Sequence, residues 1–387
     1  MYTVDNFING KSDSTSSKSS KIINPSYGED IGEVLYASKE SANTAINAAS
    51  EAFKTWSKTG MSYRAELILK FRQGVIEKSS EIVDICIKEA GKTKPDAEAE
   101  LDRAIQALTH ASGIQHFYPA HISRNVAGNI DIADMRYPIG VVAGVGPFNF
   151  PILIPILHSS MALVTGNTHI AKPSEKVPSI SRLYADIYKD VGLPDGCYNV
   201  INGGKDIVEY IVSHQKVDGL AFIGSTNAAR SLKSLGVKNN TKVQALGGGK
   251  NHMIVLPDAD LDMAADAAVS ASFGAAGQRC MAVSVVVAVG DIADELVSKI
   301  KERIPNIKMG VTDNNDTELG PVISKDNKDR ICSFIESAEP EGATVLVDGR
   351  KKSDSLNGCF VGATLIDNVK PVCLFTKMKF LDPYYHL

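Results

Sequence analysis

The stretch Gly219-Leu-Ala-Phe-Ile-Gly-Ser-Thr-Asn-Ala-Ala229 joins a short apolar run to a polar turn and then to the start of a helical pattern. Similar β-rich runs and helical segments alternate from Tyr137 to Leu246. The β-rich runs are residues 140–145, 168–171, 198–201, 219–223 and 242–246, and the helical segments are residues 180–191, 205–213 and 226–236. This alternation favours an α/β fold, in which a mostly parallel sheet is covered by helices on both faces.

Two further regions flank this one. Upstream, residues 41–116 have helical apolar spacing, and residues 129–135 alternate with period two, as in a half-exposed strand or hairpin arm. Downstream, residues 252–256 predict a strand, a helix begins near Asp260, and residues 283–289 predict another strand. A chain of 387 residues is long enough for two domains, and we expect a second α/β unit here.

The bulk composition excludes several classes of protein. A net charge of −4 gives no electrostatic case for binding nucleic acid or an anionic membrane. No apolar run approaches the roughly 20 residues that span a bilayer. The six cysteines are scattered and no histidines cluster, so we expect neither a disulfide framework nor a metal site. The N-terminus has no apolar signal core, and the cytoplasm is the expected compartment.

Cys280 ends a run of small residues, Phe273-Gly-Ala-Ala-Gly-Gln-Arg-Cys280. A lone cysteine is usually a small buried apolar residue. Here the glycines and alanines permit close backbone approach, as a ligand or an oxyanion hole requires. Arg279 places a positive charge next to the thiol, which favours the reactive thiolate. The pattern predicts that Cys280 is a nucleophile.

Two other segments carry polar side chains just after predicted strands. Asn149, between Pro147 and Pro151, is either a turn former or an amide donor to a developing oxyanion. Lys172 and Glu175 form either a solvated surface pair or a hydrogen-bonding pair for a ribose, because open α/β sheets bind nucleotides at such positions.

Gly224-Ser-Thr226 stands where a strand passes into a helix, and a helix N-terminus offers free N–H groups to an anion. A single glycine makes this a weak signal. No Gly-x-Gly-x-x-Gly fingerprint stands at any such turn, so the residue chemistry alone does not distinguish NAD from another phosphate ligand.

Taken together, five segments resemble the aldehyde dehydrogenase superfamily in order and spacing. They are residues 146–151, 166–175, 222–226, 246–248 and 277–280. Residues 249–252 and 273–282 look most like the methylmalonate-semialdehyde dehydrogenase branch, which is acylating and depends on coenzyme A. The resemblance implies a Rossmann-type NAD-binding domain (residues 1–118 and 138–246), an oligomerisation hairpin arm (119–137), an incomplete α/β catalytic domain (247–370) and an aberrant tail (371–387).

The resemblance also implies roles for individual residues. Cys280 would be the nucleophile, and Asn149 would help to form the oxyanion hole. The cofactor-binding residues would be Phe148, Lys172, Glu175, Gly224 and Ser225. Arg103 and Arg279 would hold the carboxylate of the substrate; without the resemblance, Arg103 reads as an exposed helix arginine. Where the family usually has a glycine, this chain has Ala229, a departure from the phosphate-binding pattern of the family.

The implied reaction is the NAD-dependent oxidation of malonate or methylmalonate semialdehyde to acetyl- or propanoyl-coenzyme A, a step of valine catabolism, by a homo-oligomer. Hydrolytic members carry a glutamate where this chain has Ala245. Water is a far weaker acid than a thiol and attacks a thioester slowly without a base, whereas a thiol with a pKa of about 8.5 already supplies some thiolate. Coenzyme A is therefore the expected acyl acceptor. The alternatives are a hydrolytic aldehyde dehydrogenase and a non-catalytic truncated fragment or pseudoenzyme.

The resemblance ends at about Pro371. Family members continue with Glu-Ile-Phe-Gly-Pro, whereas this chain ends Met378-Lys-Phe-Leu-Asp-Pro-Tyr-Tyr-His-Leu387. These residues can be back-translated so that skipping two nucleotides restores Glu-Ile-Phe-Gly-Pro. Our hypothesis is a frameshifted product or a sequencing error, and a genuinely short variant is the second interpretation.

Overall fold

The computed structural model describes residues 1–16, 18–353, 356–370 and 384–386. These residues form two compact units. The first comprises Met1–Ile22, Gly32–Ile82 and Ala99–Gly247, and the second comprises Ile23–Ile31, Val83–Glu98 and Gly248–Leu387. Residues 23–31 and 83–98 therefore pack with the second unit, whereas the boundaries expected from the sequence put them in the first.

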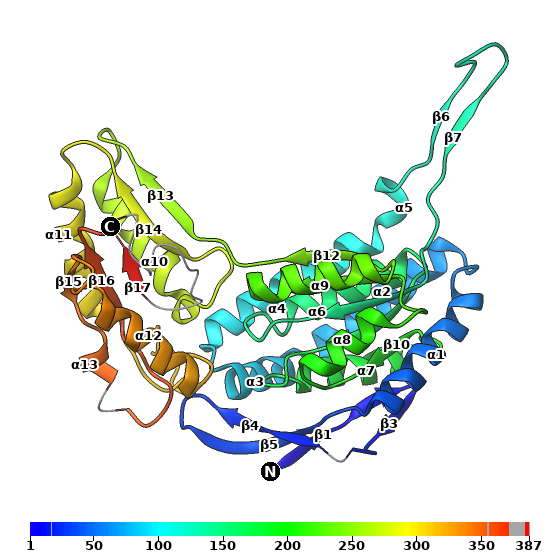
Figure 1. Cartoon of the computed structure of the whole chain (residues 1–387), viewed down its shortest axis with the longest axis horizontal. Helices are drawn as coiled ribbons and strands as arrows, with labels where there is room; N and C mark the ends of the chain where they lie inside the picture. Colours follow the sequence, from blue (N-terminus) through cyan, green and yellow to red (C-terminus); the bar gives the residue numbers. More distant parts are fainter. Residues whose placement is uncertain (17, 354–355, 371–383, 387) are drawn as a thin grey trace. The chain divides into compact units, whose positions relative to one another are not determined.

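The first unit is built on a seven-stranded sheet in the order β12-β11-β8-β9-β10-β2-β3 (Figure 1). The five strands from β12 to β10 pair in parallel, and β2 and β3 add an antiparallel edge. The strands are β2 (Asn6–Ile8), β3 (Lys11–Asp13), β8 (Val141–Val145), β9 (Thr168–Lys172), β10 (Tyr198–Val200), β11 (Gly219–Ile223) and β12 (Lys242–Leu246). The expected mostly parallel α/β sheet is confirmed, with strand ends within about one residue of the expected positions.

Helices cover both faces of this sheet. On one face, α1, α8 and α9 pack against the strands around a core that includes Ala45, Ile46, Ile211 and Leu232. On the other face lie α2, α6 and α7. The helices with residues in this unit are α1 (Lys39–Trp56), α2 (Met61–Glu77), α3 (Ser79–Ala90), α4 (Lys94–Ser112), α5 (Ile114–Phe117), α6 (Leu153–Val164), α7 (Ser179–Asp190), α8 (Lys205–Ser213) and α9 (Thr226–Lys238). Residues 83–90 of α3 and 94–98 of α4 belong to the second unit.

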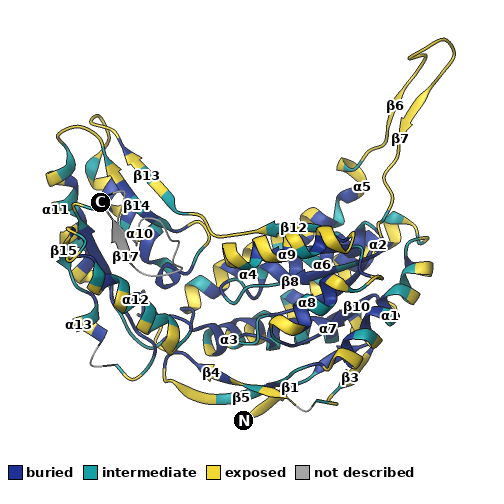
Figure 2. Cartoon of the chain, viewed as in Figure 1, coloured by how far each residue is buried: buried dark blue, intermediate teal, exposed yellow. Residues whose placement is uncertain are grey.

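A hairpin arm extends from the first unit between α5 and β8 (Figures 1 and 2). Its strands β6 (His121–Ser123) and β7 (Ile132–Asp134) pair antiparallel, as the alternating pattern predicts. All six residues of the two strands are exposed. Figure 2 shows the arm as a continuously exposed ribbon.

At the N-terminus, β1 (Tyr2–Val4) pairs in parallel with β5 (Glu29–Leu35), in a three-stranded sheet that is completed by β4 (Ser19–Asn24).

The second unit has its own five-stranded sheet, in the order β13-β14-β17-β16-β15. Its core includes Phe273, Val286, Leu296 and Val361, and α10 and α11 pack against each other beside the sheet. Its elements are β13 (Asn251–Val255), α10 (Leu261–Phe273), η1 (Gly274–Gly277), β14 (Val283–Ala288), α11 (Ala293–Arg303), η2 (Ile304–Asn306), α12 (Lys325–Ser337), β15 (Thr344–Val347), α13 (Arg350–Ser353), β16 (Thr364–Asp367) and β17 (Tyr384–His386).

The expected order of strand, helix and strand in this unit is confirmed by β13, α10 and β14. Asp260 caps α10, because its carboxylate accepts the N–H groups of Asp262 and Met263 at 3.0 and 3.1 Å. The expected departure from the family sequence falls largely on residues 371–383 and Leu387, which lie outside the described residues. No helix among the described residues is long and apolar enough to cross a membrane.

Candidate active site

The carboxyl edge of the first sheet gathers the polar residues that were expected to bind a cofactor. Val145, at the end of β8, lies opposite Lys172 of β9 on one side and Phe222 of β11 on the other. The chain runs outward from β8 through β9 to β10, and then returns to the other side of β8 for β11 and β12. Between β8 and β11 the strand order therefore reverses, and open α/β sheets bind ligands at the carboxyl ends of such strands.

Asn149 lies in the turn that follows β8 and is only 5% exposed. The N–H of Gly146 donates to the carbonyl of Lys172 at 3.0 Å and ties this turn to the neighbouring strand. Just beyond the turn, the buried carboxylate of Glu100 accepts the N–H groups of Ile152 and Leu153, both at 2.8 Å. Glu100 thus satisfies free donors at the start of α6, where a negative charge is favoured. Reasoning from the sequence missed Glu100, because no local pattern links it to α6.

Lys172 is buried, and its Nζ lies 3.4 Å from Oε2 of Glu175. Burial lowers the pKa of the Lys172 ammonium, and the neighbouring Glu175 opposes this shift. The alternative of a solvated surface pair is therefore wrong for Lys172. Phe148 is half-buried, and the Nζ of Lys176 lies 5.9 Å from the centre of its ring.

Gly224 and Ser225 connect β11 to α9, as the sequence predicts. Ser225 is the N-cap of α9, and its hydroxyl accepts the N–H of Ala228 at 3.3 Å. A Cβ at Gly224 would lie 2.5 Å from the ring of Phe222, so a side chain there would force that ring to move. Ala229 is buried against the core of the unit and does not extend toward solvent. The start of α9 is exposed at this edge and has the N–H groups and the dipole that suit a phosphate.

Ala245 lies in β12 opposite Phe222 of β11. Its methyl group packs against the core cluster of the first unit and is partly buried. A methyl group neither accepts nor donates a proton, so this position has no general base.

In the second unit, Cys280 differs from the other described cysteines because its residue is exposed. Burial raises the pKa of Cys197 to about 12 and also raises that of Cys332. A high pKa keeps these two thiols protonated and therefore weakly nucleophilic at neutral pH. Among the three, Cys280 is the most accessible to reagents in solution.

A left-handed turn leads into Cys280. Ala275, Ala276 and Gly277 have φ angles of 51°, 53° and 69°. Alanine seldom adopts this conformation, because its Cβ then crowds the backbone, at about 1–2 kcal/mol per residue. The turn ends α10 and redirects the chain toward β14.

Several side chains hold this turn. Asp96, in the first turn of α4, accepts the N–H of Ala275 at 3.0 Å and forms an ion pair with Arg279. The Gln278 amide accepts the N–H of Ile323 at 3.0 Å. On the C-terminal side of the turn, the Asn251 amide donates to the carbonyl of Cys280 at 2.9 Å.

The two expected carboxylate-binding arginines lie in different units. Arg279 belongs to the second unit and is paired with Asp96, so part of its charge is already balanced. Arg103 lies on α4 in the first unit and is exposed. Asn149 and Cys280 are likewise in the first and second units, respectively.

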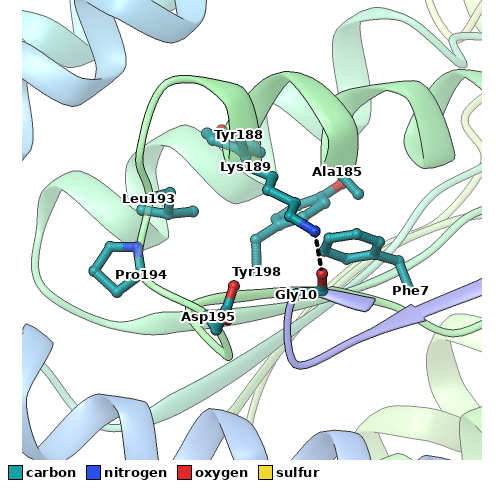
Figure 3. A pocket seen from close by; sticks show the side chains of 9 residues that line it. All are labelled: Phe7, Gly10, Ala185, Tyr188, Lys189, Leu193, Pro194, Asp195 and Tyr198. Carbon is teal, nitrogen blue, oxygen red and sulfur yellow. Dashed lines mark hydrogen bonds between the residues drawn. The ribbon is translucent and has the colours of Figure 1, made fainter. Parts of the chain in front are cut away.

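A small cavity of about 10 Å³ lies away from these residues, between α7 and the antiparallel edge of the first sheet (Figure 3). Lys189 donates to the carbonyl of Gly10 at 2.7 Å beside it, and Tyr198 contributes to its lining. A cavity of this size holds about one water molecule. It is too small for a nucleotide or a substrate.

Comparison with known proteins identifies relatives along nearly the whole chain. The Aldehyde dehydrogenase family matches residues 12–377. Malonate-semialdehyde dehydrogenase 3 of Geobacillus kaustophilus (strain HTA426) is 40% identical over 371 residues, which are 95% of this chain and 77% of that protein.

Solved structures give the same result. A methylmalonate-semialdehyde dehydrogenase from Oceanimonas doudoroffii superimposes with a TM-score of 0.97 at 39% identity, over all of this chain and 80% of that one. A structure described as a methylmalonate-semialdehyde dehydrogenase from Sinorhizobium meliloti 1021, in complex with NAD, superimposes with a TM-score of 0.96 at 36% identity, over all of this chain and 79% of that one. The family match and these relatives show that this chain belongs to the aldehyde dehydrogenase family.

Proposed function

We propose that this protein oxidises malonate or methylmalonate semialdehyde with NAD⁺ and transfers the acyl group to coenzyme A. The observation that carries the proposal is the exposed Cys280 beside Arg279, in a chain that is 40% identical to a malonate-semialdehyde dehydrogenase. The first unit would bind the cofactor and the second would carry the nucleophile. None of the described cysteines forms a disulfide, which suits the cytoplasm.

The carboxyl edge of the first sheet fits a dinucleotide. The exposed start of α9, after Gly224 and Ser225, would hold the pyrophosphate. Lys172 and Glu175 would hydrogen-bond the adenosine ribose, and Phe148 would lie beside the cofactor. A relative from Sinorhizobium meliloti was solved as a complex with NAD, which supports NAD as the dinucleotide. When bound, NAD⁺ supplies the hydride acceptor.

The chain's own residues would act on the aldehyde and on the acyl group. The Cys280 thiolate would add to the aldehyde carbon, and the family resemblance assigns the Asn149 amide to the resulting oxyanion. Loss of hydride from that carbon leaves a thioester on Cys280. The coenzyme A thiolate then displaces Cys280, which leaves as a thiolate. The substrate carboxylate leaves as CO₂, and the enolate that remains takes up a proton from solvent, which gives acetyl- or propanoyl-coenzyme A. Arg279 and Arg103 would orient that carboxylate by charge-assisted hydrogen bonds.

Ala245 supports coenzyme A rather than water as the acyl acceptor. A methyl group at this position does not activate water, whereas the thiol of coenzyme A ionises without a strong base. Hydrolysis would therefore be slow, and the thioester on Cys280 would persist until the thiol arrives.

The exposed hairpin arm supports assembly of several copies. Ile122 and Ile132 are 69% and 56% exposed on β6 and β7. Apolar side chains gathered on a projecting ribbon favour an interface. We propose that the arm binds a second copy of this chain.

The test is NADH formation from malonate semialdehyde with and without coenzyme A. With coenzyme A, we expect sustained turnover; without it, we expect one NADH per Cys280 and a thioester on that residue, seen by mass spectrometry. Rapid turnover without coenzyme A would instead establish a hydrolytic enzyme. No NADH under either condition, despite NAD⁺ binding, would overturn the proposed oxidation.

A further inference from the structure

Asp96 contacts both Arg279 and the left-handed turn, the two features that precede Cys280. It lies in the first turn of α4, and its side chain is only 15% exposed. Its Oδ1 forms the ion pair with Nη2 of Arg279, and its Oδ2 accepts the N–H of Ala275 at 3.0 Å. The hydroxyl of Thr93 donates to the same Oδ2 at 3.2 Å and fixes the carboxylate from the other side. One carboxylate thus holds both the arginine and the start of the left-handed turn.

Arg279 is also fixed by the backbone beneath it. A Cβ at Gly274 would lie 2.6 Å from Nη1 and 2.7 Å from Cζ of Arg279. The guanidinium therefore occupies the space that a side chain at residue 274 would fill. The Arg279 side chain remains 35% exposed. A guanidinium has five N–H donors, so its pairing with Asp96 leaves donors for a second carboxylate.

We propose that Asp96 is a positioning residue that fixes the Arg279 guanidinium for recognition of a substrate carboxylate next to Cys280. This inference rests on the proposed function, in which Arg279 holds that carboxylate. Asp96 has two opposite effects on the affinity of Arg279 for a carboxylate. It weakens binding because it balances part of the positive charge. It strengthens binding because it orders the long Arg279 side chain beforehand, so less conformational entropy is lost when the carboxylate binds. Because the guanidinium is held on two sides, positioning is the larger effect.

Alkylation of Cys280 tests this without cofactor or turnover. Iodoacetate and iodoacetamide both form a bond from Sγ to the methylene carbon and release iodide, but only iodoacetate carries a carboxylate. The measured quantity is the ratio of their second-order rate constants, with the modified residue identified by mass spectrometry. In Asp96→Asn, we expect the ratio to fall about tenfold, the scale of one charged hydrogen bond. The rate with iodoacetamide should change less than about threefold.

The matched control is Glu98→Gln. It removes the same charge two residues away on the same helix, where Glu98 is exposed and only loosely paired with Lys94 at 3.9 Å. Its ratio should equal that of the wild type. Gly274→Ala is the second variant, because the φ of −54° at Gly274 suits any residue, while the added methyl group displaces the guanidinium. It should lower the ratio even if Asp96→Asn fails to fold.

Arg279→Leu separates the two hypotheses. If its ratio equals that of the wild type, Arg279 does not recognise carboxylates, and that part of the proposed function fails. If Arg279→Leu lowers the ratio but Asp96→Asn raises it or leaves it unchanged, Asp96 only screens the arginine and the positioning role is wrong. The positioning role would also be overturned if Asp96→Asn and Gly274→Ala each slowed alkylation equally with both reagents. Such a result would show a general distortion of the turn.

Discussion

The buried histidine of β9 should make the first unit sensitive to acid. His169 is fully buried, and neither ring nitrogen has a hydrogen-bond partner among the described residues. Burial and, to a smaller extent, the neighbouring His158 lower its pKa from 6.5 to about 3. Both rings lie over Gly144, where a Cβ would be 2.7 Å from Cε1 of His169 and 2.8 Å from Nδ1 of His158. The ring of Tyr198 is 5.8 Å away across the β9–β10 pair.

The sign and size of the effect follow from these pKa values. In the unfolded chain, His169 takes up a proton near pH 6.5; in the folded chain it does so only near pH 3. The unfolded state therefore binds more protons between these values, and the free energy of unfolding falls as the pH falls. Well below pH 6.5, each pH unit in this window is worth about 1.4 kcal/mol. Because the unfolded histidine is only half-protonated at pH 6.5, lowering the pH from 6.5 to 4.5 should remove about 2 kcal/mol. This is a large share of a typical total of about 5–15 kcal/mol.

The measurement is urea unfolding of the wild type and of His169→Leu at pH 7.5, 6.5, 5.5 and 4.5. The difference between their free energies of unfolding separates the effect of His169 from that of the carboxylates that titrate over the same range. Between pH 6.5 and 4.5, we expect the wild type to lose about 2 kcal/mol of stability relative to the variant. The matched control is His121→Leu, on the exposed strand β6, which should show no such shift. A constant difference between wild type and His169→Leu at all four pH values would refute the reasoning.

Three further predictions concern other parts of the chain. Iodoacetamide should label Cys280 first and Cys197 only after unfolding, because burial raises the pKa of the latter to about 12, and peptide mapping would show the order. Glu100→Ala should reduce the free energy of unfolding by about 1–3 kcal/mol in urea titrations, because it leaves the N–H groups at the start of α6 unpaired; an unchanged midpoint would contradict this. Replacing Ile122 and Ile132 together by glutamate should reduce the mass of the particle measured by light scattering, and an unchanged mass would exclude the arm from the interface.

The alternation of strands and helices from Gly140 to Ala288 could be predicted, because each element has its own apolar period and each turn its own polar residues. Ser225 illustrates this, since its N-cap bond to Ala228 is local in sequence. The contacts that hold the candidate site could not be predicted in this way. Asp96 meets Ala275 across 179 positions of the chain, and Glu100 meets Ile152 across 52. No local pattern encodes such pairs.

The left-handed turn was also beyond prediction for a physical reason. Alanine prefers the right-handed helix, and the alanine-rich α10 leads directly into Ala275 and Ala276. From local preference alone, the helix would continue toward Gly277. The tertiary contacts of Asp96 and Gln278 determine the conformation instead.

In that left-handed turn, glycine is more favourable than alanine, which is the reverse of their order in a helix. In most helices alanine is preferred to glycine by about 1 kcal/mol, but at φ near 50° glycine is free of the clash that alanine suffers. A glycine at residue 276 would thus be better accommodated than the native alanine, whereas valine or isoleucine would be excluded. The segment before the nucleophile therefore tolerates change in one direction only, toward smaller residues. Substitutions at these positions that preserve the backbone conformation are therefore expected to be to glycine.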